Sequence, residues 1–181
     1  MKGLTLLFIA AIACSCNNTT TTAKGGNSDT TISKTTPESG TVPDYPYKIE
    51  HPDNWEVGSS ANTMVVLKAL KAWEENKMDE SLAYFADSVV VKFDALDKKM
   101  SNDSLKAFLG AGRNSFKTVN ERVSDWESVI SKDKSEEWVT IWYTQSWEEK
   151  NGAKDSSAVI NDLKLKNGKI TRIDEYTRKL H

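Results

Sequence analysis

The period of the hydrophobic pattern changes near position 118, and this change limits the possible folds more than any other feature. In the first half, apolar residues such as Val66, Ala69 and Trp73 recur at spacings of three and four, as on one face of a helix. In the second half, apolar and polar residues alternate, as in a strand with one buried face. Helices followed by strands predict an α+β fold, in which the sheet must bury one face against the helices.

Three helices are predicted ahead of the change in period. The first covers 62–76, and a short second helix begins at Asp79 and carries Leu82 and Phe85. The third begins at Ser101 or Asn102 and reaches Phe116. Polar residues that can cap a helix stand at these starts, which supports the assignment.

The remaining elements are strands. A β-branched and aromatic run at 89–93 predicts one strand, and a short return strand is expected at 99–100. Asn-Gly pairs at 151–152 and 167–168 favour tight turns between the later strands. Those later strands form an antiparallel meander over 119–130, 137–147, 157–165 and 170–177.

Composition excludes several kinds of site. Cys14 and Cys16 are the only cysteines, and His51 and His181 are the only histidines of the 181 residues. The folded part therefore has no material for a disulfide, a catalytic triad or a Cys/His metal site. The formal net charge of −2 gives no basic surface for nucleic acid. No motif for a phosphate or metal cofactor is present, so we expect no cofactor.

The N-terminus resembles a bacterial lipoprotein signal. Lys2 precedes an uncharged run of ten residues at 4–13, which is too short to span a bilayer and is typical of a signal peptide. Small residues then precede two cysteines, as in the lipidation motif of Bacteroidetes-type lipoproteins. This resemblance implies a signal peptide at 1–16 that is removed on export, with lipid attached to Cys16, or to Cys14 in the alternative assignment.

The segment 17–52 is rich in threonine and poor in apolar residues. It cannot bury enough surface to offset the entropy of ordering, so we expect a flexible tether between the membrane anchor and a domain at 53–181. No acidic cluster follows Cys16. By resemblance to Bacteroidetes-type lipoproteins, that absence implies the periplasmic face of the outer membrane.

Two motifs of the domain resemble the NTF2-like superfamily, which includes SnoaL-like cyclases and ketosteroid isomerases. LAYFADSVV at 82–90 is similar to the start of the first long strand in that superfamily, and KNGKITRI at 166–173 is similar to its last hairpin. The resemblance covers about 60–178. It implies a cone, in which a curved, mostly antiparallel sheet wraps around three helices of the N-terminal half.

Alternation assigns the faces of the strand at 137–147. Tyr143, Gln145 and Trp147 share the more apolar face, which we place inside the cone. The other face carries Trp138 and Trp142, and it is either a sheltered surface or the surface through which such folds form homodimers. We expect the cone to be lined by Phe93, Tyr143, Gln145, Trp147, Asn161 and Tyr176.

Asp94 is the candidate catalytic residue. In ketosteroid isomerases the catalytic aspartate follows the first long strand, and the resemblance puts that position at Phe93 or, after a shift of one residue, at Asp94. A slip of one residue moves a side chain to the other face of the sheet, so Asp94 is either a general base in the cone or the first residue of a turn. Our leading hypothesis is a non-catalytic envelope lipoprotein that binds a small apolar or amphipathic ligand or a partner protein. The alternative is a small-molecule enzyme of the SnoaL-like or isomerase type that uses Asp94 as its base.

Overall fold

The computed structural model of the chain describes residues 44–51 and 54–180. The predicted signal peptide with Cys14 and Cys16, and the predicted tether up to residue 43, lie outside the described residues. The chain divides into two units, Met1–Pro46 and Tyr47–His181, and the fold below is that of the second unit. Within the described residues, every helix is too short or too polar to cross a bilayer.

Three helices form as predicted, except that Phe85 and Phe116, expected in the second and third helix, are the first residues of strands. Serine caps two of the helices. Ser59 accepts a hydrogen bond from the backbone N–H of Ala61 at 3.1 Å and begins the first helix, and Ser101 accepts one from Ser104 at 3.3 Å and begins the third. A serine oxygen at this position satisfies a backbone donor that has no partner inside the helix. The helices are α1 (Ser60–Glu74), α2 (Met78–Leu82) and α3 (Asn102–Ser115).

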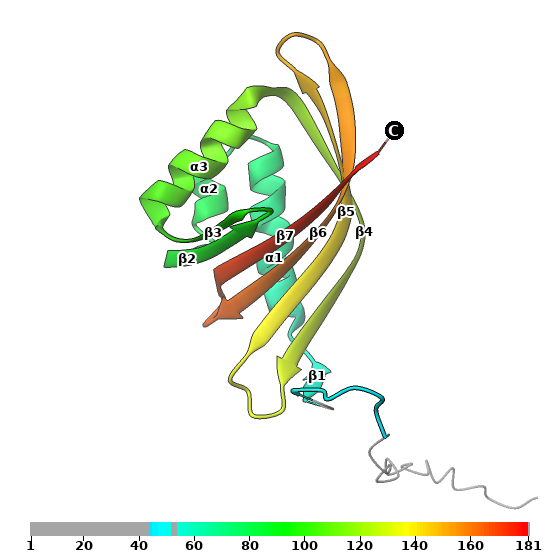
Figure 1. The fold of residues 1–181 in the computed structure, drawn as a ribbon. Coiled ribbons are helices and arrows are strands. Elements are labelled where there is room, and N and C mark those ends of the chain that lie inside the picture. Colours follow the sequence, from blue (N-terminus) through cyan, green and yellow to red (C-terminus); the bar gives the residue numbers. More distant parts are fainter. Residues whose placement is uncertain (1–43, 52–53, 181) are drawn as a thin grey trace, which may run out of the picture. The chain divides into compact units, whose positions relative to one another are not determined.

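Seven strands form one mixed sheet that curves around the helices (Figure 1). Its order is β1-β4-β5-β6-β7-β2-β3. Neighbouring strands are antiparallel except β2 and β7, which are parallel. The strands are β1 (Trp55–Val57), β2 (Phe85–Phe93), β3 (Leu96–Ser101), β4 (Phe116–Ser131), β5 (Glu137–Glu149), β6 (Lys154–Lys166) and β7 (Lys169–Leu180).

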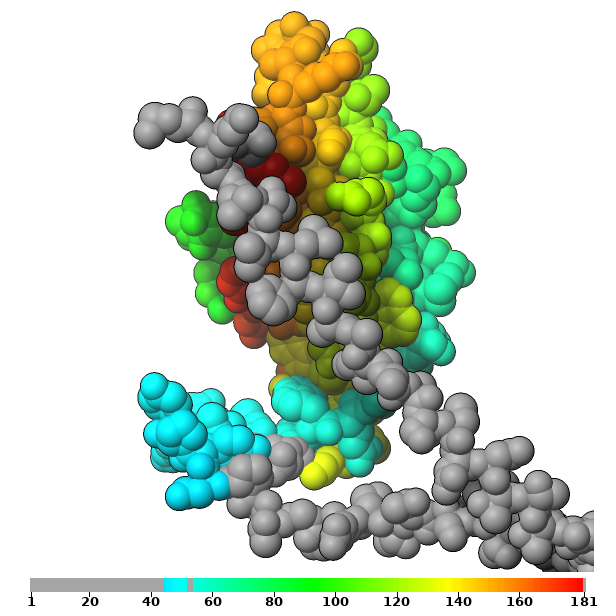
Figure 2. All heavy atoms as spheres, turned by 90° about the vertical axis from the view of Figure 1, so that its right-hand side faces the viewer, coloured from blue at the N-terminus to red at the C-terminus, as the bar shows by residue number. Residues whose placement is uncertain are grey.

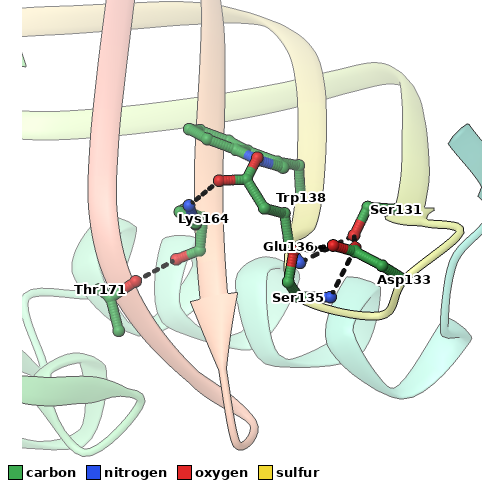
Figure 3. A network of polar contacts seen from close by, with 7 residues as sticks. All are labelled: Ser131, Asp133, Ser135, Glu136, Trp138, Lys164 and Thr171. Atoms are coloured by element: carbon green, nitrogen blue, oxygen red, sulfur yellow. Dashed lines mark hydrogen bonds and ion pairs between the residues drawn. The ribbon is translucent and has the colours of Figure 1, made fainter. Parts of the chain in front are cut away.

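The predicted meander is confirmed as β4 to β7, and polar side chains hold its turns. Asn167 and Gly168 have φ values of 53° and 69°, the left-handed conformation that a two-residue Asn-Gly turn requires. Between β4 and β5, the carboxylate of Asp133 accepts hydrogen bonds from the Ser131 hydroxyl at 2.5 Å and from the backbone N–H of Ser135 at 3.0 Å (Figure 3). These hydrogen bonds lower the pKa of Asp133 to about 2.

The core lies between the helices and the concave face of the sheet. Leu105 from α3 and Val66 from α1 are almost completely buried there, against Val139 and Ile141 of β5. The sequence pattern predicted this inward face of β5. A register shift between β4 and β5 at 123–125 adds a β-bulge, which bends and twists the sheet locally.

The sequence did not predict β1 or the parallel pairing of β2 with β7. All three residues of β1 are exposed, and three residues are too few for an alternating pattern to be recognised. The strand pairs with β4, and Gly58 follows it at close approach, donating from its backbone N–H to the Ser128 carbonyl at 2.7 Å. A β-carbon at position 58 would lie 2.3 Å from the Ser128 hydroxyl oxygen.

Candidate functional site

A cavity of about 400 Å³ lies inside the cone, between α1, α3 and the concave face of the sheet. This volume falls in the range of small-molecule sites. Most of its wall is apolar. The apolar and aromatic lining residues from α1, α3, β2 and β4 include Leu70, Trp73, Phe85, Phe93, Phe108, Leu109 and Phe116.

Three polar side chains from neighbouring strands meet in the wall of the cavity, and we call them the polar end. Tyr143 lies on β5, Asn161 on β6 and Glu175 on β7, and all three line the cavity. Asn161 and Glu175 are direct partners across the β6–β7 ladder. The alternation of the strands brings them to the same face as the core residues Ile141 and Ile173.

The polar end is joined by hydrogen bonds. The Asn161 amide lies 3.0 Å from the Tyr143 hydroxyl. With the amide oxygen accepting from that hydroxyl, the amide nitrogen donates to Glu175 Oε2 at 3.2 Å and to the Ile160 carbonyl at 3.3 Å. This orientation gives both amide atoms a partner. Asn161 therefore connects a phenol to a carboxylate inside the cavity.

Burial changes the acid–base properties of this end. Burial raises the pKa of Glu175 to about 6, and the hydrogen bond from Asn161 opposes the shift. The pKa of Tyr143 is raised well above its ordinary value, first by burial and then by the charges of Glu175 and Glu121. Tyr143 is thus a neutral hydrogen-bond donor or acceptor near neutral pH. Glu175 changes its protonation there.

A second carboxyl group, that of Glu121, lies next to this end. Glu121 is on β4, and its partner across the ladder is Gln145, which lines the cavity. Both carboxyl oxygens of Glu121 are buried, and neither has a hydrogen-bond partner among the described residues. Burial, followed by the charges of Glu74 and Glu175, raises the pKa of Glu121 to about 8.

The charge of Arg113 lowers the pKa of Glu121 and so opposes the effect of burial, but Arg113 makes no hydrogen bond to Glu121. It lies in the last turn of α3 and is only 8% exposed. Its guanidinium donates to the carbonyls of Trp73 at 3.2 Å and Glu74 at 2.9 Å. These are carbonyls at the C-terminal end of α1, which lack partners inside the helix. Arg113 therefore joins the ends of α1 and α3.

The structure brings four of the predicted lining residues together, namely Phe93, Tyr143, Gln145 and Asn161, all of which line the cavity. Trp147 is outside its wall and packs behind it against Phe116, with ring centroids 5.5 Å apart. Tyr176 is outside as well and is 63% exposed. It follows Glu175 on β7, so alternation turns it to the outer face.

Asp94 also lies outside the cavity. Phe93 pairs with Leu96, so Asp94 and Ala95 form a two-residue turn between β2 and β3. Asp94 has a φ of 49° and is exposed, which matches the turn alternative and not the general-base one. Phe93, one residue earlier, faces the cavity and packs on Phe108 at 5.6 Å between ring centroids.

The two buried carboxyl groups were not predicted as site residues. Glu175 follows Ile173 at the strand period, and this spacing was the available signal, but a charged residue is usually a surface residue. Glu121 stands among Asn120 and Arg122. Glu121 shares the strand period with Val119 and Val123, and this spacing was the available signal. The register of β4 against β5, which pairs Glu121 with Gln145, places it on the concave face.

The outer face of the sheet carries Trp138 and Trp142, as predicted. Trp138 contacts Lys164 and Arg172, whose charged groups lie 5.5 and 5.4 Å from its ring centroid, and its Nε1 donates to Glu136 at 3.3 Å (Figure 3). Figure 2 views the sheet from the side opposite the helices, with β4 in yellow-green and β6 in orange.

In the described part of the chain, no group of three or more His, Cys, Asp or Glu side chains is placed to hold a metal ion.

Comparison with known proteins gives matches among solved structures. No family model matches the chain, and a search of curated proteins finds no similar sequence. An NTF2-like protein of unknown function from Exiguobacterium sp. 255-15 is 12% identical, with a TM-score of 0.52 over 63% of this chain and 98% of that chain. An LEH-like epoxide hydrolase from M. tuberculosis is 14% identical, with a TM-score of 0.53 over 66% and 84%.

A third solved structure is a hypothetical protein with a ketosteroid isomerase-like fold from Catenulispora acidiphila DSM 44928, in complex with trimethylamine. It is 15% identical, with a TM-score of 0.51 over 62% of this chain and 83% of that chain. At these identities the similarity concerns the fold alone. The helices and the curved sheet between residues 55 and 180 therefore form a cone of the NTF2-like fold.

Proposed function

We propose that the protein binds a small ligand inside the cone, with the apolar part of the ligand against the aromatic wall and one polar group at Tyr143, Asn161 and Glu175. The observation that carries this proposal is the cavity of about 400 Å³ with a mostly apolar wall that contains the hydrogen-bonded group of Tyr143, Asn161 and Glu175. Contacts with an apolar wall contribute affinity but do not orient the ligand, and a few placed polar groups fix its orientation. The neighbour from Catenulispora acidiphila is in complex with trimethylamine, so a protein of this fold can take up a small organic molecule.

Catalysis by proton transfer is the second candidate, and Glu175 replaces Asp94 as its acid or base. Glu175 lines the cavity, its pKa of about 6 is close to neutral pH, and Asn161 fixes its carboxylate. A group with such a pKa can both accept and donate a proton under physiological conditions. Tyr143, whose O–H donates to Asn161, would offer its hydroxyl oxygen to the same substrate as a neutral hydrogen-bond acceptor. The neighbour described as an epoxide hydrolase supports the suitability of the fold for chemistry.

Filling the cavity tests the binding proposal. Gly112 lines the cavity from α3, and a β-carbon there would meet no atom within 4 Å, so Gly112→Leu adds an apolar side chain to the wall. Gly110→Leu is the matched control, because Gly110 lies in the same helix, has equal space and does not line the cavity. Either substitution replaces a helical glycine by a better helix former.

The reference chain for these experiments carries Cys14→Ala and Cys16→Ala and is produced in the cytoplasm, so that no lipid is attached. The ligand is N-phenyl-1-naphthylamine, a weakly basic and uncharged apolar fluorophore. We expect saturable binding at one site, weakened about tenfold or more by Gly112→Leu and unchanged by Gly110→Leu. Equal affinity of both variants would contradict binding inside the cone. If Glu175→Gln abolishes a measured turnover but leaves this affinity unchanged, the catalytic candidate is supported.

We also propose that the cone is exported and held by lipid at the periplasmic face of the outer membrane. The support is the sequence at 1–16, with its basic start, apolar run and paired cysteines. We expect the native chain to fractionate with membranes and the Cys16→Ala, Cys14→Ala double variant to become soluble. Membrane association of the double variant would refute lipid anchoring. A homodimer through Trp138 and Trp142, and a partner protein, stay predictions.

A further inference from the structure

Two carboxyl groups on the concave face lack a counter-ion. Glu175 lines the cavity, and its single polar partner among the described residues is the neutral amide of Asn161. Glu121 has buried oxygens without any hydrogen-bond partner in the same part of the chain. The charge of Glu175 raises the pKa of Glu121, and the charges of both groups raise the pKa of Tyr143. A buried carboxylate is costly unless it is paired and hydrogen-bonded.

The protein's own cations near this place are occupied. The Arg113 guanidinium is bound to the backbone carbonyls of Trp73 and Glu74. The Lys71 ammonium is exposed and bound to the Glu74 carboxylate at 2.8 Å. The charged groups that act on Glu121 are therefore Glu74 of α1, Arg113 of α3 and Glu175 of β7, two of them negative.

From this arrangement we infer that the polar end receives a protonated amine, so that the ligand is a small amine with an apolar body. This inference rests on the proposed binding function and adds the chemical class of the ligand. The ammonium group would donate hydrogen bonds to the Glu175 carboxylate and balance its negative charge, with Glu121 beside it as a second carboxyl group. A hydrogen bond between an ammonium and a carboxylate is shorter and stronger than one between neutral groups. The apolar wall would cover the rest of the ligand and exclude water from the ion pair.

The amine would change the protonation of the site. Near pH 7 the pKa of Glu121, beside the cavity, is about 8 and that of Glu175, in its wall, is about 6, so the two groups together hold about one proton, most of it on Glu121. An ammonium ion stabilises the ionised carboxylates and lowers their pKa. Binding of an amine should therefore release protons to the buffer, and binding of a neutral ligand with the same body should not.

Three ligands with one apolar body separate these cases, namely 4-phenylbutylamine, 4-phenylbutanol and 4-phenylbutyrate. Their affinities for the reference chain are measured by isothermal titration calorimetry at pH 7, in phosphate and in imidazole buffer, because the two buffers differ in ionisation enthalpy. We expect the amine to bind about tenfold or more tightly than the alcohol, which corresponds to roughly 1.4 kcal/mol. The carboxylate should bind most weakly. The amine should give a buffer-dependent heat that corresponds to proton release, and the alcohol should give none.

Variants assign the effect to the two carboxyl groups. Glu175→Gln should reduce the affinity for the amine about tenfold and change that for the alcohol by less than about twofold. Glu121→Gln should remove most of the proton release. Glu127→Gln is the control, because Glu127 is an exposed residue of the same strand that pairs with Thr140 of the outer face. All three variants keep the size of the side chain, and circular dichroism verifies their fold.

The outcomes distinguish the inference from the proposed function. Alcohol binding that equals or exceeds amine binding would overturn the inference and leave binding inside the cone intact. Amine preference that survives in both Glu175→Gln and Glu121→Gln would also overturn it. If none of the three ligands binds, both the inference and the proposed function for bodies of this size fail.

Discussion

Replacing Glu121 by glutamine should change the pH dependence of stability in a defined direction. Glu121 is buried without a partner, and its folded-state pKa is about 8 against an ordinary value of 4.5. The folded state therefore holds a proton that the unfolded state has lost between these two values. Stability falls as pH rises wherever the folded state binds more protons than the unfolded state. The wild-type chain should accordingly lose stability between about pH 4.5 and pH 8, and the glutamine variant lacks this component.

The magnitude follows from the size of the shift. One proton contributes about 1.4 kcal/mol per pH unit, so from pH 4.5 to pH 7 the Glu121 component amounts to at most about 3 kcal/mol. It reaches its limit above pH 8, where both states are ionised. Glu175 acts in the same direction over a narrower interval, because its pKa is raised to about 6. Asp133, with a pKa lowered to about 2, acts in the opposite direction, and its contribution is lost only in acid.

Urea denaturation of the reference chain and of its Glu121→Gln variant measures this component, with tryptophan fluorescence as the signal. The difference in the free energy of unfolding is compared at pH 5 and pH 8, since groups common to both proteins then cancel. We expect the variant to gain roughly 2–3 kcal/mol relative to the reference chain between these two pH values. Glu127→Gln should gain nothing, because Glu127 is exposed. A difference that stays constant with pH would refute the buried, unpartnered state of Glu121.

Two further substitutions test the framework around the cavity. Gly58→Ala should destabilise the chain by roughly 1–3 kcal/mol in thermal denaturation, because the added β-carbon would lie 2.3 Å from the Ser128 hydroxyl oxygen. An unchanged melting temperature would contradict the close approach of this segment to β4. Asp94→Asn should change the free energy of unfolding by less than about 0.5 kcal/mol and leave ligand affinity unchanged, because asparagine tolerates the left-handed turn conformation. A loss of affinity would show that residue 94 belongs to the binding site.

Hydrophobic period predicted most of the fold. Helical spacing identified α1 and α3, and alternation identified β4 to β7 and the inward face of β5, because burial of one face imposes these periods. The parallel pairing of β2 with β7 joins segments far apart in the sequence, and no local pattern encodes such a partner. β1 was missed because three residues are too few to show a period, and its place is set by pairing with β4.

The site was predictable where it is apolar and unpredictable where it is charged. Phe93 and Tyr143 line the cavity because their strands present them to the core, and this follows from alternation. A glutamate on a strand has the same period, but solvent is its usual surrounding, so the period alone does not identify it as a site residue. The register of the β4–β5 ladder, which pairs Glu121 with Gln145, places Glu121 on the concave face. Asp94 shows the reverse case: it was predicted as a site residue, and the structure places it in the turn between β2 and β3, outside the cavity.

The division of the cavity into an apolar wall and a polar end separates affinity from selection. The wall comes mainly from helices and β2, and burial of apolar surface against it favours any ligand of suitable size. The carboxyl groups come from β4 and β7 and distinguish ligands by charge. Gly112→Leu should therefore weaken the amine and the alcohol by the same factor, and Glu175→Gln should change the ratio of the two affinities. If Gly112→Leu changes that ratio and Glu175→Gln does not, the wall and not the carboxylates selects the ligand.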